Sequence, residues 1–332
     1  MPKLKKKNPT QRLSRSARAV ATLGFLTVSG LLVGCVSLAY VFVAYPSFQT
    51  QRQPVVAGAV IAPWEKPVLK ANAPIRPIIR AKSGILIDID SAEILWANHA
   101  DVVRPLASLT KLVTVGAYLD SNPNLDQQYI IPARFDTNGI ADIVEPGTNV
   151  STLRVATGTR LSYKGLVTAA LVSSANNAAL ALGDTILAKN PNSLQQYAAA
   201  QGASTAQIVE ASGLDPANVG SAHDVALLAH ALFRNSLVQS LTSLATVDVP
   251  SSGNTLHVRS TNALIGRPGY NIDAGKTGYL VEAGYNLAVQ ASRENHTLLL
   301  VLLGEPSTGA RFTDADALLQ WAFAAHTWVT KY

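Results

Sequence analysis

The sequence has few of the residues that build disulfides, metal sites or nucleotide sites. Its 332 residues include a single cysteine, Cys35, which excludes an intrachain disulfide. The six histidines are scattered along the chain, and none has the spacing of metal ligands. The sequence also lacks a glycine-rich phosphate loop and a dinucleotide fingerprint. We therefore expect no metal and no organic cofactor.

Acidic residues are lacking from residues 1–18, which hold seven of the 27 basic residues. The other 20 basic residues face 21 acidic ones, so the rest of the chain is almost neutral. A nucleic-acid-binding domain carries its basic patch on the folded part. The charge distribution therefore argues against nucleic acid as a partner and marks residues 1–18 as a basic cytoplasmic tail.

An uncharged run rich in Leu, Val and Ala follows the tail, at residues 19–44. Its length is sufficient for a helix that spans the hydrocarbon core of a bilayer. The positive charge before the run places the N-terminus in the cytoplasm. We predict a transmembrane signal anchor at residues 19–45. The alternatives are a cleaved signal peptide, whose apolar region is usually shorter, and a lipoprotein processed at Cys35.

The remainder of the chain divides into a linker and a folded domain. Six prolines in residues 46–82 predict a semi-rigid linker. From Ser83 onward, alternating apolar residues predict a strand hairpin at 85–98, and helical patterns follow at 163–171, 177–187, 194–200 and 224–233. The C-terminal part predicts strands at 270–280, 285–292 and 296–303 and a helix at 312–328. Strands at both ends with helices between them predict an α+β domain at residues 83–330, with a sheet formed by both ends.

A candidate nucleophile lies in the stretch Ser108-Leu109-Thr110-Lys111, which opens a run of helix formers. Residues three apart share a helix face, so Lys111 can reach Ser108. A desolvated lysine can take the proton of a serine hydroxyl. Backbone N–H groups in the first helical turn suit an oxygen that becomes negative. The alternative interpretation is an ordinary helix start, because a Ser and a Lys at this spacing often occur by chance.

Two further motifs follow in the order that this chemistry needs. Lys276-Thr277-Gly278 precedes Tyr279 in a predicted strand, and Ser-x-Asn occurs at Ser174, Ser252 and Ser260. We assign the pair Ser174 and Asn176, because Ser174 lies 66 residues after Ser108 in a break between helices. Lys82-Ser83-Gly84 precedes the candidate nucleophile and is interpreted as the end of the linker. Ser-x-x-Lys, Ser-x-Asn and Lys-Thr-Gly in this order are typical of penicillin-binding proteins and serine β-lactamases.

From Ser83 to about Trp328 the chain resembles the D-alanyl-D-alanine carboxypeptidase family, the low-molecular-weight penicillin-binding proteins. The resemblance covers the segments PLASLTKLVT, LVSSANNAALAL, SGLDPANVGSAHDVALLA and STNALIGRPGYNIDAGKTGYLVEAGYNLAV. Asn177 stands where the family often has Asp. The resemblance implies a penicillin-binding-protein/β-lactamase-like fold, in which an antiparallel sheet packs with helices beside a helical subdomain. It also implies a peptidoglycan stem peptide as substrate and β-lactams as inhibitors.

The resemblance also implies a role for each motif residue. Ser108 would be the nucleophile, Lys111 the base, and Ser174 the group that passes a proton to the leaving amine. The substrate would be bound by Asn176, Lys276, Thr277, Gly278 and Tyr279. Backbone N–H groups of Ser108 and Tyr279 would form the oxyanion hole, and the small Gly278 would let substrate lie against the strand. Lys111 must be neutral to act, and we expect repulsion from Lys276 to help, with burial contributing.

The predicted function is that of a serine-type D-Ala-D-Ala carboxypeptidase that forms an acyl-enzyme on Ser108. We expect a single-pass protein of the bacterial plasma membrane, with the DD-peptidase catalytic domain on the outer side. A DD-endopeptidase of cross-links would use identical chemistry. A serine β-lactamase is a weaker alternative, because Glu210 misses the E-x-x-L-N spacing by one residue. A non-enzymatic wall-binding protein is the least favoured.

Overall fold

A computed structural model of the chain describes residues 65–142 and 150–330. The predicted tail and signal anchor, residues 1–45, lie outside the described residues. Within the described ranges, none of the helices combines the length and the apolar content needed to span a bilayer.

The central element is a five-stranded antiparallel sheet with the strand order β10-β11-β12-β2-β3. Its strands are β2 (Ser83–Asp88), β3 (Ile94–Asn98), β10 (Asn271–Leu280), β11 (Gly284–Arg293) and β12 (His296–Glu305). β12 pairs with β2, so that Leu300 lies opposite Leu86. The predicted α+β sheet formed by both ends of the domain is therefore confirmed.

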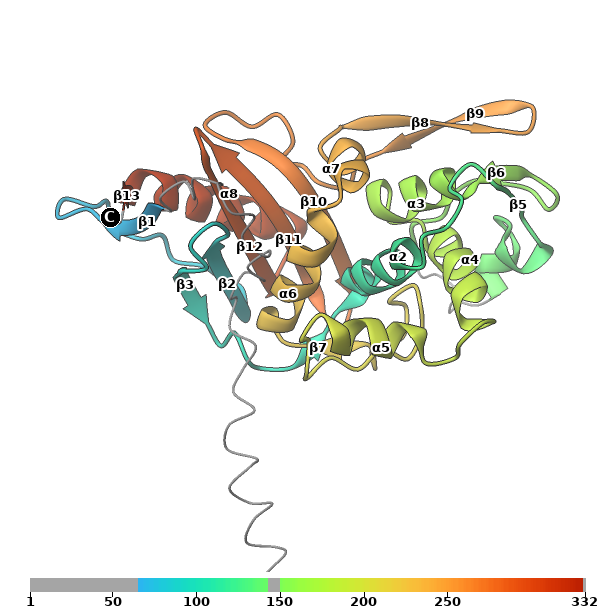
Figure 1. The fold of residues 1–332 in the computed structure, drawn as a ribbon, viewed down its shortest axis with the longest axis horizontal. Helices are drawn as coiled ribbons and strands as arrows, with labels where there is room; N and C mark the ends of the chain where they lie inside the picture. Colours follow the sequence, from blue (N-terminus) through green and yellow to red (C-terminus); the bar gives the residue numbers. More distant parts are fainter. Residues whose placement is uncertain (1–64, 143–149, 331–332) are drawn as a thin grey trace, which may run out of the picture. The chain divides into compact units, whose positions relative to one another are not determined.

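Helices cover both faces of this sheet (Figure 1). On one face, α8 (Thr308–Ala325) contributes Leu318 and Leu319 to a buried cluster that includes Leu300 of β12. On the other face, α6 (Ala222–Phe233) packs against β12, β2 and β11. All six residues of β2 are buried, as expected for a strand covered on both sides.

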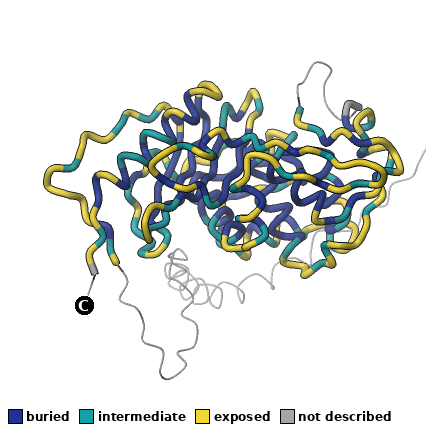
Figure 2. Tube along the Cα trace, turned by 90° about the horizontal axis from the view of Figure 1, so that it is seen from above, coloured by how far each residue is buried: buried dark blue, intermediate teal, exposed yellow. Residues whose placement is uncertain are grey.

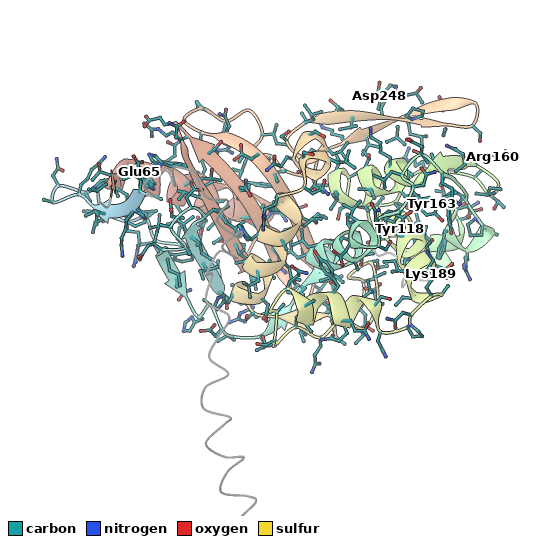
Figure 3. All side chains as sticks on the ribbon, in the orientation of Figure 1. Glu65, Tyr118, Arg160, Tyr163, Lys189 and Asp248 are labelled. Atoms are coloured by element: carbon teal, nitrogen blue, oxygen red, sulfur yellow. The ribbon has the colours of Figure 1, made fainter. Side chains whose placement is uncertain are left out.

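A helical subdomain packs around α2 (Thr110–Asp120), in which every residue from Thr110 to Tyr118 is buried. Its other members are α3 (Tyr163–Val172), α4 (Asn176–Leu187) and α5 (Ser193–Ala200), and α7 (Ser236–Thr242) lies between α3 and β10. Tyr118 of α2 stacks on Tyr163 of α3 at 5.2 Å between ring centroids (Figure 3). Buried residues gather in the middle of the domain (Figure 2), where α6 contacts both α2 and the sheet strands β12 and β2. The sheet and the helices therefore share one interior.

Short strands form small sheets outside the central sheet. A small antiparallel sheet orders β5 (Gln128–Ile130), β6 (Arg160–Ser162), β8 (Thr246–Ser251) and β9 (Asn254–Arg259). β4 (Arg104–Pro105) pairs with β7 (Val219–Gly220), directly before η1 (Ala107–Leu109), a 3-10 turn. Two further 3-10 turns are η2 (Ala133–Phe135) and η3 (Gly139–Asp142).

Residues 65–82 were assigned to the linker by the proline pattern, but the structure places them in the folded domain. β1 (Glu65–Leu69) pairs with β13 (His326–Thr330), which replaces the last residues of the predicted C-terminal helix. Pro67 is compatible with this pairing, because proline is tolerated in edge strands. The proline count therefore did not distinguish a linker from an edge strand.

The segment after β1 is tied to α8 by an ion pair. The Arg80 guanidinium donates to the buried Asp314 carboxylate at 2.5 Å and 3.1 Å, and the Arg80 backbone N–H donates at 2.6 Å. Replacing Arg80 with alanine should lower the free energy of unfolding, because the buried Asp314 carboxylate loses its charged donor. Urea denaturation measures this change.

Arg76 is the matched control, because it lies exposed in the same segment. R76A should change the free energy of unfolding by less than about 0.5 kcal/mol. Equal effects of the two substitutions would contradict a stabilising role for the Arg80–Asp314 pair.

Candidate active site

Ser108 lies in η1, between β4 and α2. Its neighbours Leu106, Ala107 and Leu109 are buried, and Ser108 itself is half-buried. Ala107 has φ of +49°, in the left-handed region that residues with a Cβ rarely adopt. Such backbone conformations persist where the surrounding structure enforces them, and they are frequent at active sites. The turn therefore holds three apolar anchors inward and leaves the serine hydroxyl accessible.

Lys111 is completely buried and its amine contacts three oxygens. Lys111 Nζ lies 2.9 Å from Ser108 Oγ, 2.7 Å from Asn176 Oδ1 and 2.5 Å from the carbonyl oxygen of Ser212. The three-residue spacing therefore does bring Lys111 to Ser108, as predicted. The other two contacts come from residues 65 and 101 positions away in the chain.

Ser174 and Lys276 meet in the same interior. Ser174 lies between α3 and α4 with φ of +61°, and its Oγ accepts a hydrogen bond of 2.7 Å from Lys276 Nζ. Lys276 also donates to the carbonyl oxygen of Thr277 at 2.6 Å. The Ser174–Asn176 segment thus contacts both lysines, Lys276 through Ser174 and Lys111 through Asn176. Both residues are buried, so the assigned Ser-x-Asn motif joins the other two motifs.

The alternative motifs at Ser252 and Ser83 lie away from Ser108 and Lys111. Ser252 and Gly253 form the turn of the β8–β9 hairpin, and Gly253 has φ of +87° there. Ser83 begins β2 and accepts a hydrogen bond of 2.6 Å from Arg104. Ser260 precedes Thr261, which does reach the site. The rejection of Ser252 and of Lys82-Ser83-Gly84 agrees with these positions.

Burial is the main cause of the lowered pKa values of both lysines. It lowers the pKa of Lys111 to about 7, and the Glu210 carboxylate opposes this shift. Burial also lowers the pKa of Lys276 well below its ordinary value, with further lowering by the charges of Lys111 and Arg311. We expected repulsion from Lys276 to depress the pKa of Lys111, with burial contributing. In the structure desolvation is the largest cause, because the Lys111 side chain has no exposed surface.

Gly278 brings β10 against the nucleophile turn. A Cβ on Gly278 would lie 3.1 Å from the Leu106 carbonyl oxygen and 3.2 Å from the Ser108 nitrogen. From the sequence, we explain the small size of Gly278 by the space that a substrate needs against the strand. The structure shows another reason for a glycine here, because a side chain would crowd η1. The next residue, Tyr279, exposes about half of its side chain, and its ring stacks on Tyr285 at 4.3 Å.

The Glu210 carboxylate organises the loop beside Lys111. From the sequence alone, this residue is only a candidate β-lactamase acid. Glu210 accepts backbone hydrogen bonds from Ser212 at 2.6 Å and from Gly213, and it accepts a side-chain bond from Asn218 at 2.7 Å. The Ser212 hydroxyl donates to the same carboxylate at 2.7 Å. Glu210 therefore fixes the loop that presents the Ser212 carbonyl to Lys111, and both of its oxygens are engaged.

Two further buried residues that the sequence did not identify hold the sheet against η1. The Asn286 amide nitrogen donates to the carbonyls of Pro105 and Leu106 at 3.1 Å each, and its oxygen accepts from Gly304 at 2.9 Å. Arg311 of α8 donates to the carbonyls of Gly278 at 3.0 Å and Asn286 at 3.2 Å. The only signal in the sequence is a polar residue within an apolar strand and an arginine within an apolar helix.

Asn177 has a structural role at the position where the family often has Asp. Its amide oxygen accepts from the Leu153 nitrogen at 2.9 Å, and its amide nitrogen donates to the carbonyls of Phe135 at 3.1 Å and Leu153 at 2.9 Å. An ionised aspartate could not donate these two bonds. Asn177 therefore holds two loops against the start of α4.

The fold and the site define a class: a penicillin-binding-protein-like serine hydrolase with a buried amine beside its serine. Comparisons with known proteins agree. The family model of the D-alanyl-D-alanine carboxypeptidases, peptidase family S11, matches residues 70–307. The D-alanyl-D-alanine endopeptidase of Pseudomonas aeruginosa is 31% identical over 272 residues, which cover 80% of this chain and 84% of that protein.

Two further similarities extend this result. The D-alanyl-D-alanine carboxypeptidase DacC of Escherichia coli K12 is 27% identical over 271 residues, which cover 76% of this chain and 64% of that protein. The structure of penicillin-binding protein D2 from Listeria monocytogenes, in its ampicillin-bound form, superposes with a TM-score of 0.62 and 28% identity. It covers 75% of this chain and 100% of that one. The chain belongs to the D-alanyl-D-alanine carboxypeptidase family and is a hydrolase of the serine peptidase type.

Gly213 is the residue of the Glu210 loop whose substitution tests this geometry most directly. It has φ of +83°, and a Cβ there would clash with the Ala107 carbonyl next to Ser108. G213A should reduce acylation by a fluorescent penicillin at least tenfold, because the clash displaces either η1 or the loop. Gel fluorescence after timed labelling measures the rate.

The control is G266A. Gly266 has φ of +81°, but a Cβ there would meet no atom within 4 Å. It shares the backbone cost and lacks the clash, so its labelling rate should stay within about twofold of the parent protein. Equal losses in both variants would contradict the packing argument.

Proposed function

We propose that this protein removes the terminal D-alanine of peptidoglycan stem peptides through an acyl-enzyme on Ser108. The observation that carries the proposal is the fully buried Lys111 amine 2.9 Å from Ser108 Oγ. An amine with a pKa of about 7 is partly neutral at physiological pH and can act as a base.

The contacts of Lys111 favour transfer of the serine proton. A neutral amine has two N–H donors and one lone pair. The Asn176 amide oxygen and the Ser212 carbonyl can only accept hydrogen bonds, so they take the two N–H groups. The lone pair is then directed to the third neighbour, the Ser108 hydroxyl. In this arrangement Lys111 removes the proton as Ser108 Oγ bonds to the scissile carbonyl carbon.

The second half of acylation needs a proton at the leaving nitrogen. Ser174 Oγ, hydrogen-bonded to Lys276, is the group that we assign to this transfer. As the C–N bond breaks, Ser174 gives its proton to the D-alanine amine, and Lys276, which donates a hydrogen bond to Ser174, replaces it. The proton that Lys111 took from Ser108 then passes to Lys276, so that Lys111 is neutral again. Water then attacks the ester carbonyl as Lys111 takes its proton, and Lys111 returns that proton to Ser108 Oγ as the C–Oγ bond breaks and the shortened peptide leaves.

Substrate recognition is assigned to β10. Lys276 and Thr277 would bind the terminal carboxylate, and Asn176 would orient the substrate amide as well as Lys111. The backbone N–H groups of Ser108 and Tyr279 would stabilise the oxyanion by about 3 kcal/mol per donor. The close packing of Gly278 on η1 supports this proposal, because it brings the backbones of Ser108 and β10 together.

A D-alanyl-D-alanine endopeptidase is the second candidate, favoured by the similarity to the Pseudomonas aeruginosa protein of that name. The acyl-enzyme would be the same, and only the leaving amine would differ. Digestion of purified muropeptides separates the two, since a carboxypeptidase releases D-alanine and an endopeptidase splits cross-linked dimers. A β-lactamase is disfavoured, because the Glu210 carboxylate is engaged by the loop it organises.

We propose a single-pass protein of the bacterial plasma membrane, anchored by residues 19–45, with the catalytic domain on the outer side, where peptidoglycan lies. The support is the sequence of the N-terminal segment: a basic stretch followed by an uncharged apolar run of spanning length.

Replacing Ser108 with alanine should abolish acylation by benzylpenicillin. Intact mass measurement should show one adduct on the parent protein, and peptide mapping should place it on the segment that contains Ser108. S252A, which alters the rejected Ser-x-Asn motif, should retain the adduct. Continued labelling of S108A would refute the assignment of the nucleophile.

The acylation rate should depend on pH through Lys111. Because the base must be neutral, the rate should fall about tenfold per pH unit below about 7 and level off above it. Stopped-flow acylation by nitrocefin between pH 5.5 and 8.5 measures this profile. K111R should be slow throughout, since arginine stays protonated. A rate independent of pH in this range would contradict Lys111 as the base.

A further inference from the structure

Thr261 reaches the site although it belongs to the rejected Ser260-Thr261-Asn262 motif. It follows β9 and precedes β10, and its Oγ1 lies 2.6 Å from Thr277 Oγ1. Thr277 is buried and Thr261 is half-buried. A hydroxyl pair at this distance shares one hydrogen bond.

The position of Thr261 is determined from two sides. Its backbone N–H donates to the carbonyl of Val172, the last residue of α3, at 3.1 Å. On the other side, the buried Asn262 accepts from Leu264 at 3.1 Å and so fixes the turn that leads to β10. Thr261 is therefore held by the end of the helix that precedes Ser174 and by the turn before Lys276.

The hydroxyl protons of Thr261 and Thr277 determine which residue donates the hydrogen bond. Each threonine hydroxyl has one proton to donate and two lone pairs that accept. If Thr261 donates to Thr277, the Thr277 proton is free for a ligand. A carboxylate only accepts hydrogen bonds, so a carboxylate at Thr277 selects this order. Donation from Thr261 also polarises the Thr277 hydroxyl and strengthens the bond that it donates.

We propose that Thr261 is a positioning residue that directs the Thr277 hydroxyl toward the terminal carboxylate of the substrate. It thereby contributes to the selection of peptides that end in a free carboxylate. This inference rests on the proposed function, in which Thr277 binds that carboxylate. Thr261 acts through Thr277 and has no part in the proton transfers at Ser108.

The test compares an acyl-D-Ala-D-Ala peptide with the same peptide ending in a carboxamide. T261V removes the hydroxyl and keeps the side-chain shape. We expect kcat/KM for the free acid to fall about fivefold, the effect of losing one hydrogen bond between neutral groups, with less than a twofold loss for the carboxamide. T261S, which keeps a hydroxyl, should restore at least half of the acid rate.

Two controls separate positioning from general damage. T255V alters an exposed threonine of the preceding strand, β9, and should leave both rates unchanged. In a T277V background, T261V should cause no further loss, because Thr261 acts only through Thr277. If Thr261 had only a structural role, T261V would lower kcat/KM equally for both substrates. The loss would then also occur in the T277V background.

The outcomes distinguish this inference from the proposed function. A parent protein that prefers the acid, together with a T261V variant that keeps the same preference, would overturn the role of Thr261 alone. Equal losses in T261S and T261V would also overturn it. A parent protein that cleaves neither peptide would overturn the proposed function, and the inference with it.

Discussion

Burial of the Lys111 amine is the constraint on which the rest of the site depends. An ammonium with no exposed surface is costly unless oxygens replace its water, and three do so here. Those three oxygens come from η1, from α4 and from the loop after Glu210. One buried charge therefore holds three distant segments together, and its desolvation also gives the amine a pKa of about 7.

The supporting residues act on the backbone of the site more than on its side chains. Glu210 holds the loop that carries the Ser212 carbonyl, and Asn286 holds the carbonyls on either side of the β4–η1 junction. Arg311 ties α8 to the carbonyl of Gly278 in β10. Asn286 and Arg311 each contact two other segments, whereas Glu210 shapes its own loop beside Lys111. A change in any of the three should therefore alter the alignment of Ser108, Lys111 and β10.

Most of the elements could be predicted from local pattern. The alternation in β2 and β3, the apolar C-terminal strands and the helices at 163–172 and 176–187 follow from periodicity, and the structure has them within a few residues. The pairing of β1 with β13 could not be predicted in this way, because Pro67 and its neighbours have no periodicity and the strand forms only when the chain's other end supplies a partner. The helix predicted to Trp328 ended at Ala325 for the same reason.

The sequence by itself determined the order of the three motifs, the spacing that joins Lys111 to Ser108, and the choice of Ser174 over two equivalent motifs. Only the tertiary structure decided which groups surround each of these residues. Local pattern could not assign the observed roles of Glu210, Thr261, Asn286 and Arg311, since their partners lie in other segments or are backbone atoms. Spacing along a chain specifies contacts within one helical turn, whereas a buried polar network is specified by packing.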